Sequence, residues 1–78
     1  MTTVYLGPND PNPTERHVTV VIHRDHVGVE KGYFFDSAEK DLGGSGPFDW
    51  RMAEAIEKAE RLAADRRILI VAVRAKRD

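Results

Sequence analysis

The chain has 78 residues, no cysteine, 12 basic and 13 acidic side chains, and a net charge of −1. This length suits a single domain, and 41% hydrophobic with 32% charged residues excludes a collagenous, disordered or disulfide-stapled chain. Because a domain this small buries only about 60% of its unfolded surface, we expect marginal stability and help from a second subunit or a partner.

We expect one domain over residues 1–78, with loops at 7–15 and 36–46 and a fraying basic tail at 75–78. No apolar run approaches the roughly 18 residues of a membrane helix. The N-terminal residues lack the basic and apolar stretches of a signal peptide. Together with the lack of cysteine, these features predict a cytoplasmic protein with no membrane partner.

The first expected element is a short strand over Thr3–Leu6. It stops at the segment 7–15, whose three prolines remove backbone donors and fix φ, so that this segment must be loop. A β-hairpin is expected over residues 16–35, because apolar residues alternate with polar ones on both sides of Arg24-Asp25. Two forms of the turn fit this one register: Arg24-Asp25 as a two-residue turn, or a longer loop with the same strand pairing.

That pairing places the hairpin's apolar residues on one face, with Ile22 opposite Val27, Val20 opposite Val29 and Val18 opposite Lys31. In this register, Tyr33 and Phe35 share the apolar face, while Val21 and Phe34 point to the other side.

An α-helix is expected over residues 47–66, with Pro47 at its first position. One stripe of the helix is apolar and rich in alanine, so the helix can lie close to a sheet; it comprises Phe48, Met52, Ala55, Ile56, Ala59, Leu62 and Ala63. Trp50 falls on the opposite side of the helical wheel. It either packs on the 36–46 loop or is an exposed anchor for a partner, since tryptophan is enriched at binding hot spots.

The last strand is expected over residues 67–74. Its run 68–73 is rich in β-branched residues and contains no alternating polar ones, which predicts that both faces of the strand are buried. With Leu69, Val71 and Val73 facing the helix, Ile68 and Ile70 point away from it. The predicted fold class is α+β, with one helix on an antiparallel-rich sheet of three or four strands, in the order β-β-β-α-β or β-β-α-β.

One helix covers one face of such a sheet, so the open face would carry an apolar group that marks an interface. The predicted function is a small non-catalytic protein-interaction module, of the adaptor or inhibitor type, homodimeric through the open sheet face. The expected partner-binding residues are Trp50 on the helix and, on the sheet, Val21, Phe34, Ile68 and Ile70.

Nucleic-acid binding is the alternative from another class. Five basic residues against one acidic residue fall within 66–78, namely Arg66, Arg67, Arg74, Lys76 and Arg77. Tyr33 or Phe34 would then stack on bases. The overall charge of −1 argues against this alternative, because dedicated nucleic-acid binders carry a clear positive excess.

Catalytic and cofactor motifs are scarce. The two serines, Ser37 and Ser45, fall in the expected loop, and residues 43–47 lack the pattern of a phosphate-binding loop. His23 and His26 flank the turn and are the only weak candidates for a metal, with no fourth protein ligand in view. We therefore expect no cofactor and no metal, and a histidine-dependent enzyme using His17, His23 or His26 is the least favoured interpretation.

Overall fold

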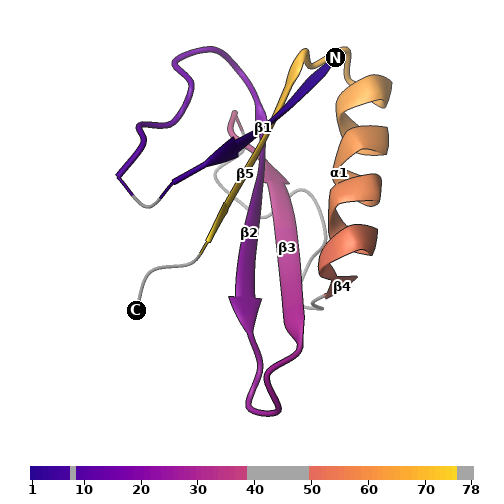
Figure 1. Ribbon diagram of the computed structural model, residues 1–78. Coiled ribbons are helices and arrows are strands. Elements are labelled where there is room, and N and C mark those ends of the chain that lie inside the picture. The colour runs from indigo at the N-terminus through magenta and orange to yellow at the C-terminus, as the bar shows by residue number, and fades with distance from the viewer. Residues whose placement is uncertain (8, 39–49, 76–78) are drawn as a thin grey trace.

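The structure is a computed structural model that describes residues 1–7, 9–38 and 50–75. One helix packs on a sheet (Figure 1), whose strands in order are β1, β5, β2, β3 and β4. The elements are β1 (Thr2–Leu6), β2 (Val18–Arg24), β3 (Glu30–Asp36), β4 (Trp50–Arg51), α1 (Met52–Asp65) and β5 (Ile70–Ala75). The predicted α+β class is confirmed. The sheet is mixed, because β5 is parallel to β1 and β2, whereas β3 is antiparallel to β2 and β4.

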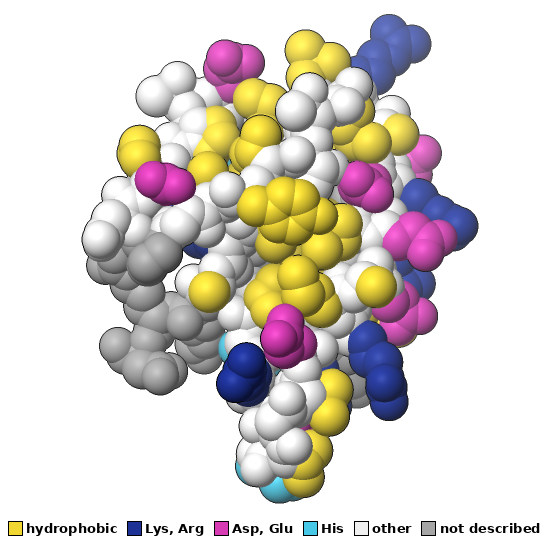
Figure 2. Space-filling model, in the orientation of Figure 1, with side chains coloured by type: hydrophobic (Ala, Val, Ile, Leu, Met, Phe, Trp, Pro, Cys, Tyr) yellow, Lys and Arg dark blue, Asp and Glu magenta, His cyan; other side chains and the backbone are white. Residues whose placement is uncertain are grey.

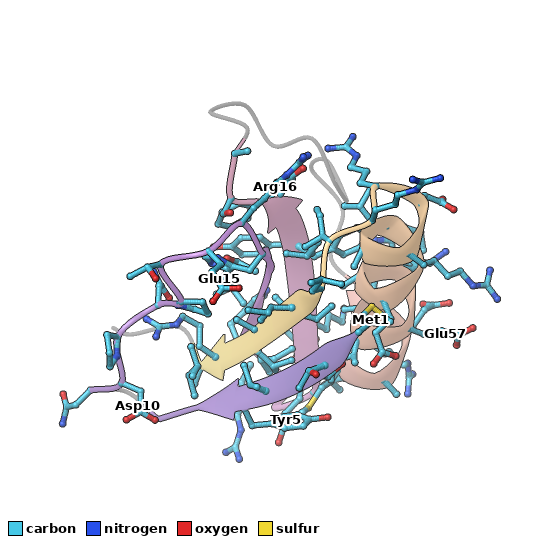
Figure 3. All side chains as sticks on the ribbon, turned by 90° about the horizontal axis from the view of Figure 1, so that it is seen from above. Met1, Tyr5, Asp10, Glu15, Arg16 and Glu57 are labelled. Carbon is cyan, nitrogen blue, oxygen red and sulfur yellow. The ribbon has the colours of Figure 1, made fainter. Side chains whose placement is uncertain are left out.

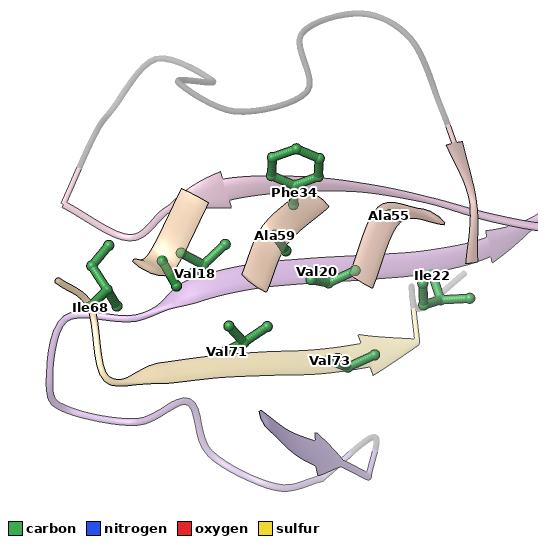
Figure 4. Packing of buried hydrophobic residues seen from close by; sticks show 10 residues of the cluster. Val18, Val20, Ile22, Phe34, Ala55, Ala59, Ile68, Val71 and Val73 are labelled. Carbon is green, nitrogen blue, oxygen red and sulfur yellow. The ribbon is translucent and has the colours of Figure 1, made fainter. Parts of the chain in front are cut away.

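The core lies between α1 and the strands β2, β3 and β5 (Figure 4). Three alanines of α1, Ala55, Ala59 and Ala63, are fully buried, and their short side chains let the helix lie close to the sheet as expected. The strands contribute Val18, Val20, Ile22, Phe34, Val71 and Val73, and Ile68 completes the cluster. In Figure 4, α1 passes over β2 and β3, and β1 lies beyond the core residues.

The hairpin register differs from the predicted one. The turn spans residues 25–29, and Arg24 is the partner of Glu30. Asp25 shapes this turn, because its Oδ1 accepts hydrogen bonds from the amides of Val27 and Val29, and Gly28 supplies the positive φ of 84°. The pairing moves by five residues, and an odd shift exchanges the two faces of β3. Phe34 therefore faces α1, opposite Val20.

Two more corrections concern the ends of α1. The helix begins at Met52, and Trp50 lies before it in β4, paired with Gly32 of β3. At the other end, Arg67 has a left-handed φ of 56°, and the Ile68 amide donates to the Ala63 carbonyl (2.8 Å). This Schellman turn folds Ile68 back onto the core and leaves Leu69 67% exposed. The expected alternation thus holds from Ile70 onward and fails for Ile68 and Leu69.

The face opposite α1 is not left open over β5. Because β1 and β2 flank β5 and run parallel to it, the connection between them, described at residues 9–17, must cross the sheet. In Figure 1 this connection lies on the other side of the strands from α1. The Arg74 side chain, on the same side, donates to the Asp10 carbonyl (2.7 Å). Thr19 and Ala72 are accordingly buried on this face, so part of the cover that β5 requires comes from the chain itself.

Candidate interaction surface

Two of the four predicted sheet residues lie on the wrong side for an open-face interface. Phe34 and Ile68, with exposed fractions of 7% and 4%, are part of the core beneath α1. Val21 and Ile70 are on the face opposite α1 as expected, and both are half-buried. The predicted patch is therefore divided between the two faces of the sheet, and these four residues do not form one surface.

Trp50 is half-buried and packs against the core. The Lys58 ammonium lies 4.3 Å from the centroid of its ring, on the helix side of the indole. The indole nitrogen Nε1 is buried and has no hydrogen-bond partner among the described residues. The loop expected at 36–46, on which Trp50 was predicted to pack, lies almost wholly outside the described residues.

The predicted basic residues that the structure describes do not lie together on one surface. Arg66 lies at the C-terminal end of α1 and donates to Asp36 (3.0 Å), whereas Arg74 is on the opposite face, bound to the Asp10 carbonyl. Arg67 is exposed at the Schellman turn, and residues 76 and 77 lie outside the described residues. A single basic stripe along the C-terminal segment is therefore not seen among the three described arginines.

On the α1 side of the sheet, the buried Asp36 carboxylate forms ion pairs with two arginines. This carboxylate, with no exposed surface, accepts from Arg16 Nε (3.1 Å) and Arg66 (3.0 Å), from a second Arg16 nitrogen, and from the Ala38 amide (3.0 Å). The Arg16 guanidinium is the main cause that holds the pKa of Asp36 far below its usual range; burial opposes it, and the Ala38 amide and Arg66 add to it. Asp36 thus ties the end of β3 to the segment before β2 and to the end of α1.

The histidines lie apart. His17 is buried at the far end of the hairpin from Glu30 and Lys31, its Nδ1 2.8 Å from the Glu15 carbonyl. His23 lies beside the Tyr33 ring, with centroids 6.2 Å apart, and His26 is exposed in the turn. Among the described residues, no three histidine, aspartate or glutamate side chains come together as metal ligands would.

The strand β1 forms one edge of the sheet, and within the described residues only β5 pairs with it. The Thr2 amide donates to the Leu69 carbonyl (2.7 Å), so Thr2 directs its backbone groups toward β5. Successive residues of a strand alternate in this respect. Thr3 and Tyr5 therefore direct their N–H and C=O groups outward, at the open edge. The strand is uncharged, and it contains no proline that would block pairing.

An apolar surface adjoins this edge. Tyr5 is 66% exposed and lies on the α1 side of the sheet, because it is in register with the core residue Val73 (Figure 3). On α1, the half-buried Ile56 and Met52 are one and two helical turns before Glu60, whose carboxylate accepts from Thr3 Oγ1 of β1 (2.6 Å). Figure 2 shows hydrophobic side chains gathered between the strands and α1. We call Thr3, Tyr5, Met52, Ile56 and Glu60 the β1 surface.

The Thr3–Glu60 hydrogen bond joins β1 to α1, and the two elements run in opposite directions (Figure 1). From Thr3 toward Tyr5 the strand therefore runs toward the N-terminal half of α1, which carries Ile56 and Met52. The outward edge and these apolar side chains lie on the same side of the molecule. Sequence reasoning missed this surface, although one signal was present: Thr2–Leu6 has no charge in a chain that is 32% charged.

The face opposite α1 carries a row of aromatic rings. Tyr33 and Phe35 are stacked, with centroids 6.4 Å apart and an interplanar angle of 22°, and His23 follows Tyr33. All three are half-buried. Of the two aromatic residues expected to stack on bases, Tyr33 is on this accessible face and Phe34 is not.

No protein-family model, curated protein or solved structure matches the chain. Among the described residues, no helix has the length and apolar content that crossing a bilayer requires.

Proposed function

We propose that the chain is a small, cytoplasmic, non-catalytic interaction module that binds protein by accepting an extended strand at the β1 edge. The observation that carries this proposal is that the outward backbone groups of Thr3 and Tyr5 lie on the same edge as the exposed Tyr5 ring, on the side of the molecule where α1 carries the half-buried Met52 and Ile56. Strand addition draws affinity from backbone hydrogen bonds and specificity from adjoining side-chain contacts. The β1 surface offers both.

The two edges of the sheet support this assignment by their difference. The β4 edge is two residues long and includes Arg51, and a short, charged edge discourages pairing. The β1 edge is five residues long, uncharged, and has Tyr5 largely exposed beside it. Large aromatic side chains such as tyrosine are enriched where proteins bind one another.

The test uses a synthetic hexapeptide of alternating threonine and valine, titrated into the full chain and followed by NMR. We expect shift changes centred on β1 and slower hydrogen exchange at the Thr3 and Tyr5 amides. Tyr5→Pro should abolish binding, because it removes an outward N–H and leaves the β1–β5 hydrogen bonds in place. Tyr5→Thr is the matched control, which keeps the N–H and should weaken binding without abolishing it. Equal binding by the proline variant, or no change at β1, would refute the assignment.

A second candidate function is binding of single-stranded nucleic acid on the face opposite α1, favoured by the stacked Tyr33 and Phe35 rings. Aromatic rings on a sheet are platforms on which successive bases stack. A labelled oligouridylate should then bind at low salt with an affinity that falls as salt rises, and Tyr33→Ala should weaken it. Absence of binding at low salt removes this candidate.

A further inference from the structure

We propose that the strand received at the β1 edge is β1 of a second copy, so that two chains form one continuous sheet about a two-fold axis at Val4. This inference rests on the proposed function and names the partner of the same surface. Its starting point is that Thr3 and Tyr5, the two residues with outward backbone groups, lie symmetrically on either side of Val4.

The hydrogen-bond geometry selects one register. In an antiparallel pair, residues that exchange both backbone bonds alternate with residues that exchange none. Placing Thr3 opposite the partner's Tyr5 satisfies this rule in both halves of the pair, and it pairs the whole of Thr2–Leu6. Val4 then lies opposite its own symmetry mate in a non-hydrogen-bonded position, where the two side chains approach most closely.

The side chains on the α1 side are complementary in this register. Each Tyr5 lies across from the partner's Thr3, whose hydroxyl is already bound to Glu60 Oε2. The Tyr5 phenol is a donor on the same face as that carboxylate, which has a second oxygen to accept it. Both tyrosines then lie on the α1 side of the joined sheet, over β1, which lies beyond the core residues that α1 covers (Figure 4).

Charge and symmetry favour a second copy over an unrelated strand. In an isologous contact, residue i meets the partner's residue j and the reverse, and only a residue on the axis meets its own symmetry mate, so a charge at the centre of the edge would oppose a like charge. Thr2–Leu6 carries none, and its centre is apolar. The paired strand is only five residues long, so we expect a weak, reversible dimer.

The decisive experiment exploits the position of Val4 at the axis. Sedimentation equilibrium of the full chain should show a reversible dimer. Val4→Lys and Val4→Glu should each be monomeric, because like charges would face each other, whereas a mixture of the two should form a heterodimer. Val27→Lys, at an exposed apolar position in the hairpin turn, is the matched control and should dimerise as the unmutated chain does.

Hydrogen exchange on the unmutated chain gives a readout that needs no variant. Amide protection at Thr3 and Tyr5 should rise with protein concentration, whereas Thr2 stays protected throughout by its bond to Leu69. A dimer unaffected by both Val4 variants would place self-association elsewhere. A monomer with unprotected Thr3 and Tyr5 amides at all concentrations would overturn the self-pairing. Hexapeptide binding by such a monomer would leave the strand-accepting function standing.

Discussion

Gly32 and Ile22 are directly opposed in the β2–β3 register, and the Ile22 Cδ1 stands where a side chain on Gly32 would be. A Cβ at Gly32 would lie 2.7 Å from that atom, 3.0 Å from the Val21 carbonyl oxygen and 3.4 Å from the Ala55 Cβ. The absence of a side chain at this position lets α1 approach the hairpin.

Gly32→Ala should therefore destabilise the protein by about 1–3 kcal/mol, the usual cost of overfilling a packed core. Urea unfolding followed by circular dichroism measures the loss. Ile22→Val removes the Cδ1 atom, so the double variant Ile22→Val/Gly32→Ala should be less destabilised than the sum of the single variants. Simple additivity would show that the Val21 carbonyl, not Ile22, sets the limit.

The sequence was sufficient for the fold class and for the buried stripe of α1, because alanines at 55, 59 and 63 leave one orientation of the helix that packs. It was insufficient for the face of β3. The apolar alternation of Val27, Val29, Tyr33 and Phe35 predicts a core face, whereas the five-residue turn built by Asp25 and Gly28 places their alternates inside. The turn geometry, and not the hydrophobic pattern, determines which face of β3 meets α1. The predicted site residue Phe34 is therefore in the core.

The β1 surface could not be predicted from the sequence, for a different reason. It depends on which strand neighbours β5, and the long-range parallel pairing of β1 with β5 leaves no local pattern in the sequence. The same pairing obliges the connection between β1 and β2 to cross the sheet, where its described residues 9–17 cover part of the face that was expected to be open. An uncharged Thr2–Leu6 segment shows only that the strand tolerates pairing on both sides.

Arg67→Gly should stabilise the protein. Arg67 ends the Schellman turn at a left-handed φ of 56°, a conformation that costs a residue with a Cβ about 1–2 kcal/mol and glycine almost nothing. Part of this gain is offset by the greater freedom of glycine in the unfolded chain, so we expect a net gain of about 0.5–1 kcal/mol. Thermal unfolding should shift upward by about 2–8 °C. Arg67→Ala retains the strain and should give no increase; an equal increase would point to loss of the arginine charge instead.

Asp36→Asn should remove part of the protein's sensitivity to acid. The pKa of Asp36 in the folded chain lies far below the 3.8 of an unperturbed aspartate, chiefly because Arg16 donates to it. Its contribution is therefore complete above pH 3.8 and is lost as the pH falls through the folded-state pKa. At neutral pH, Asp36→Asn should cost about 1.5–3 kcal/mol, as expected for hydrogen bonds to a charged group. Urea unfolding in acid should show a smaller difference between the two proteins, and a difference that grows in acid would contradict this role.

Comparing Trp50→Phe with Trp50→Ala should separate the contribution of the aromatic ring to stability from that of the indole nitrogen. The ring is half-buried against the core beneath Lys58, so Trp50→Ala should cost about 2 kcal/mol, below the roughly 3–5 kcal/mol of a fully buried aromatic truncation. Nε1 is buried with no partner among the described residues, and such a donor has a desolvation cost of about 1–3 kcal/mol. Trp50→Phe keeps ring contacts and removes that cost, so its free energy of unfolding should lie within about 0.5 kcal/mol of the unmutated chain. Circular dichroism is the suitable probe, because Trp50 is the only tryptophan. If Trp50→Phe costs as much as Trp50→Ala, the indole nitrogen is bonded in the folded protein and Trp50 is held by a polar contact as well as by packing.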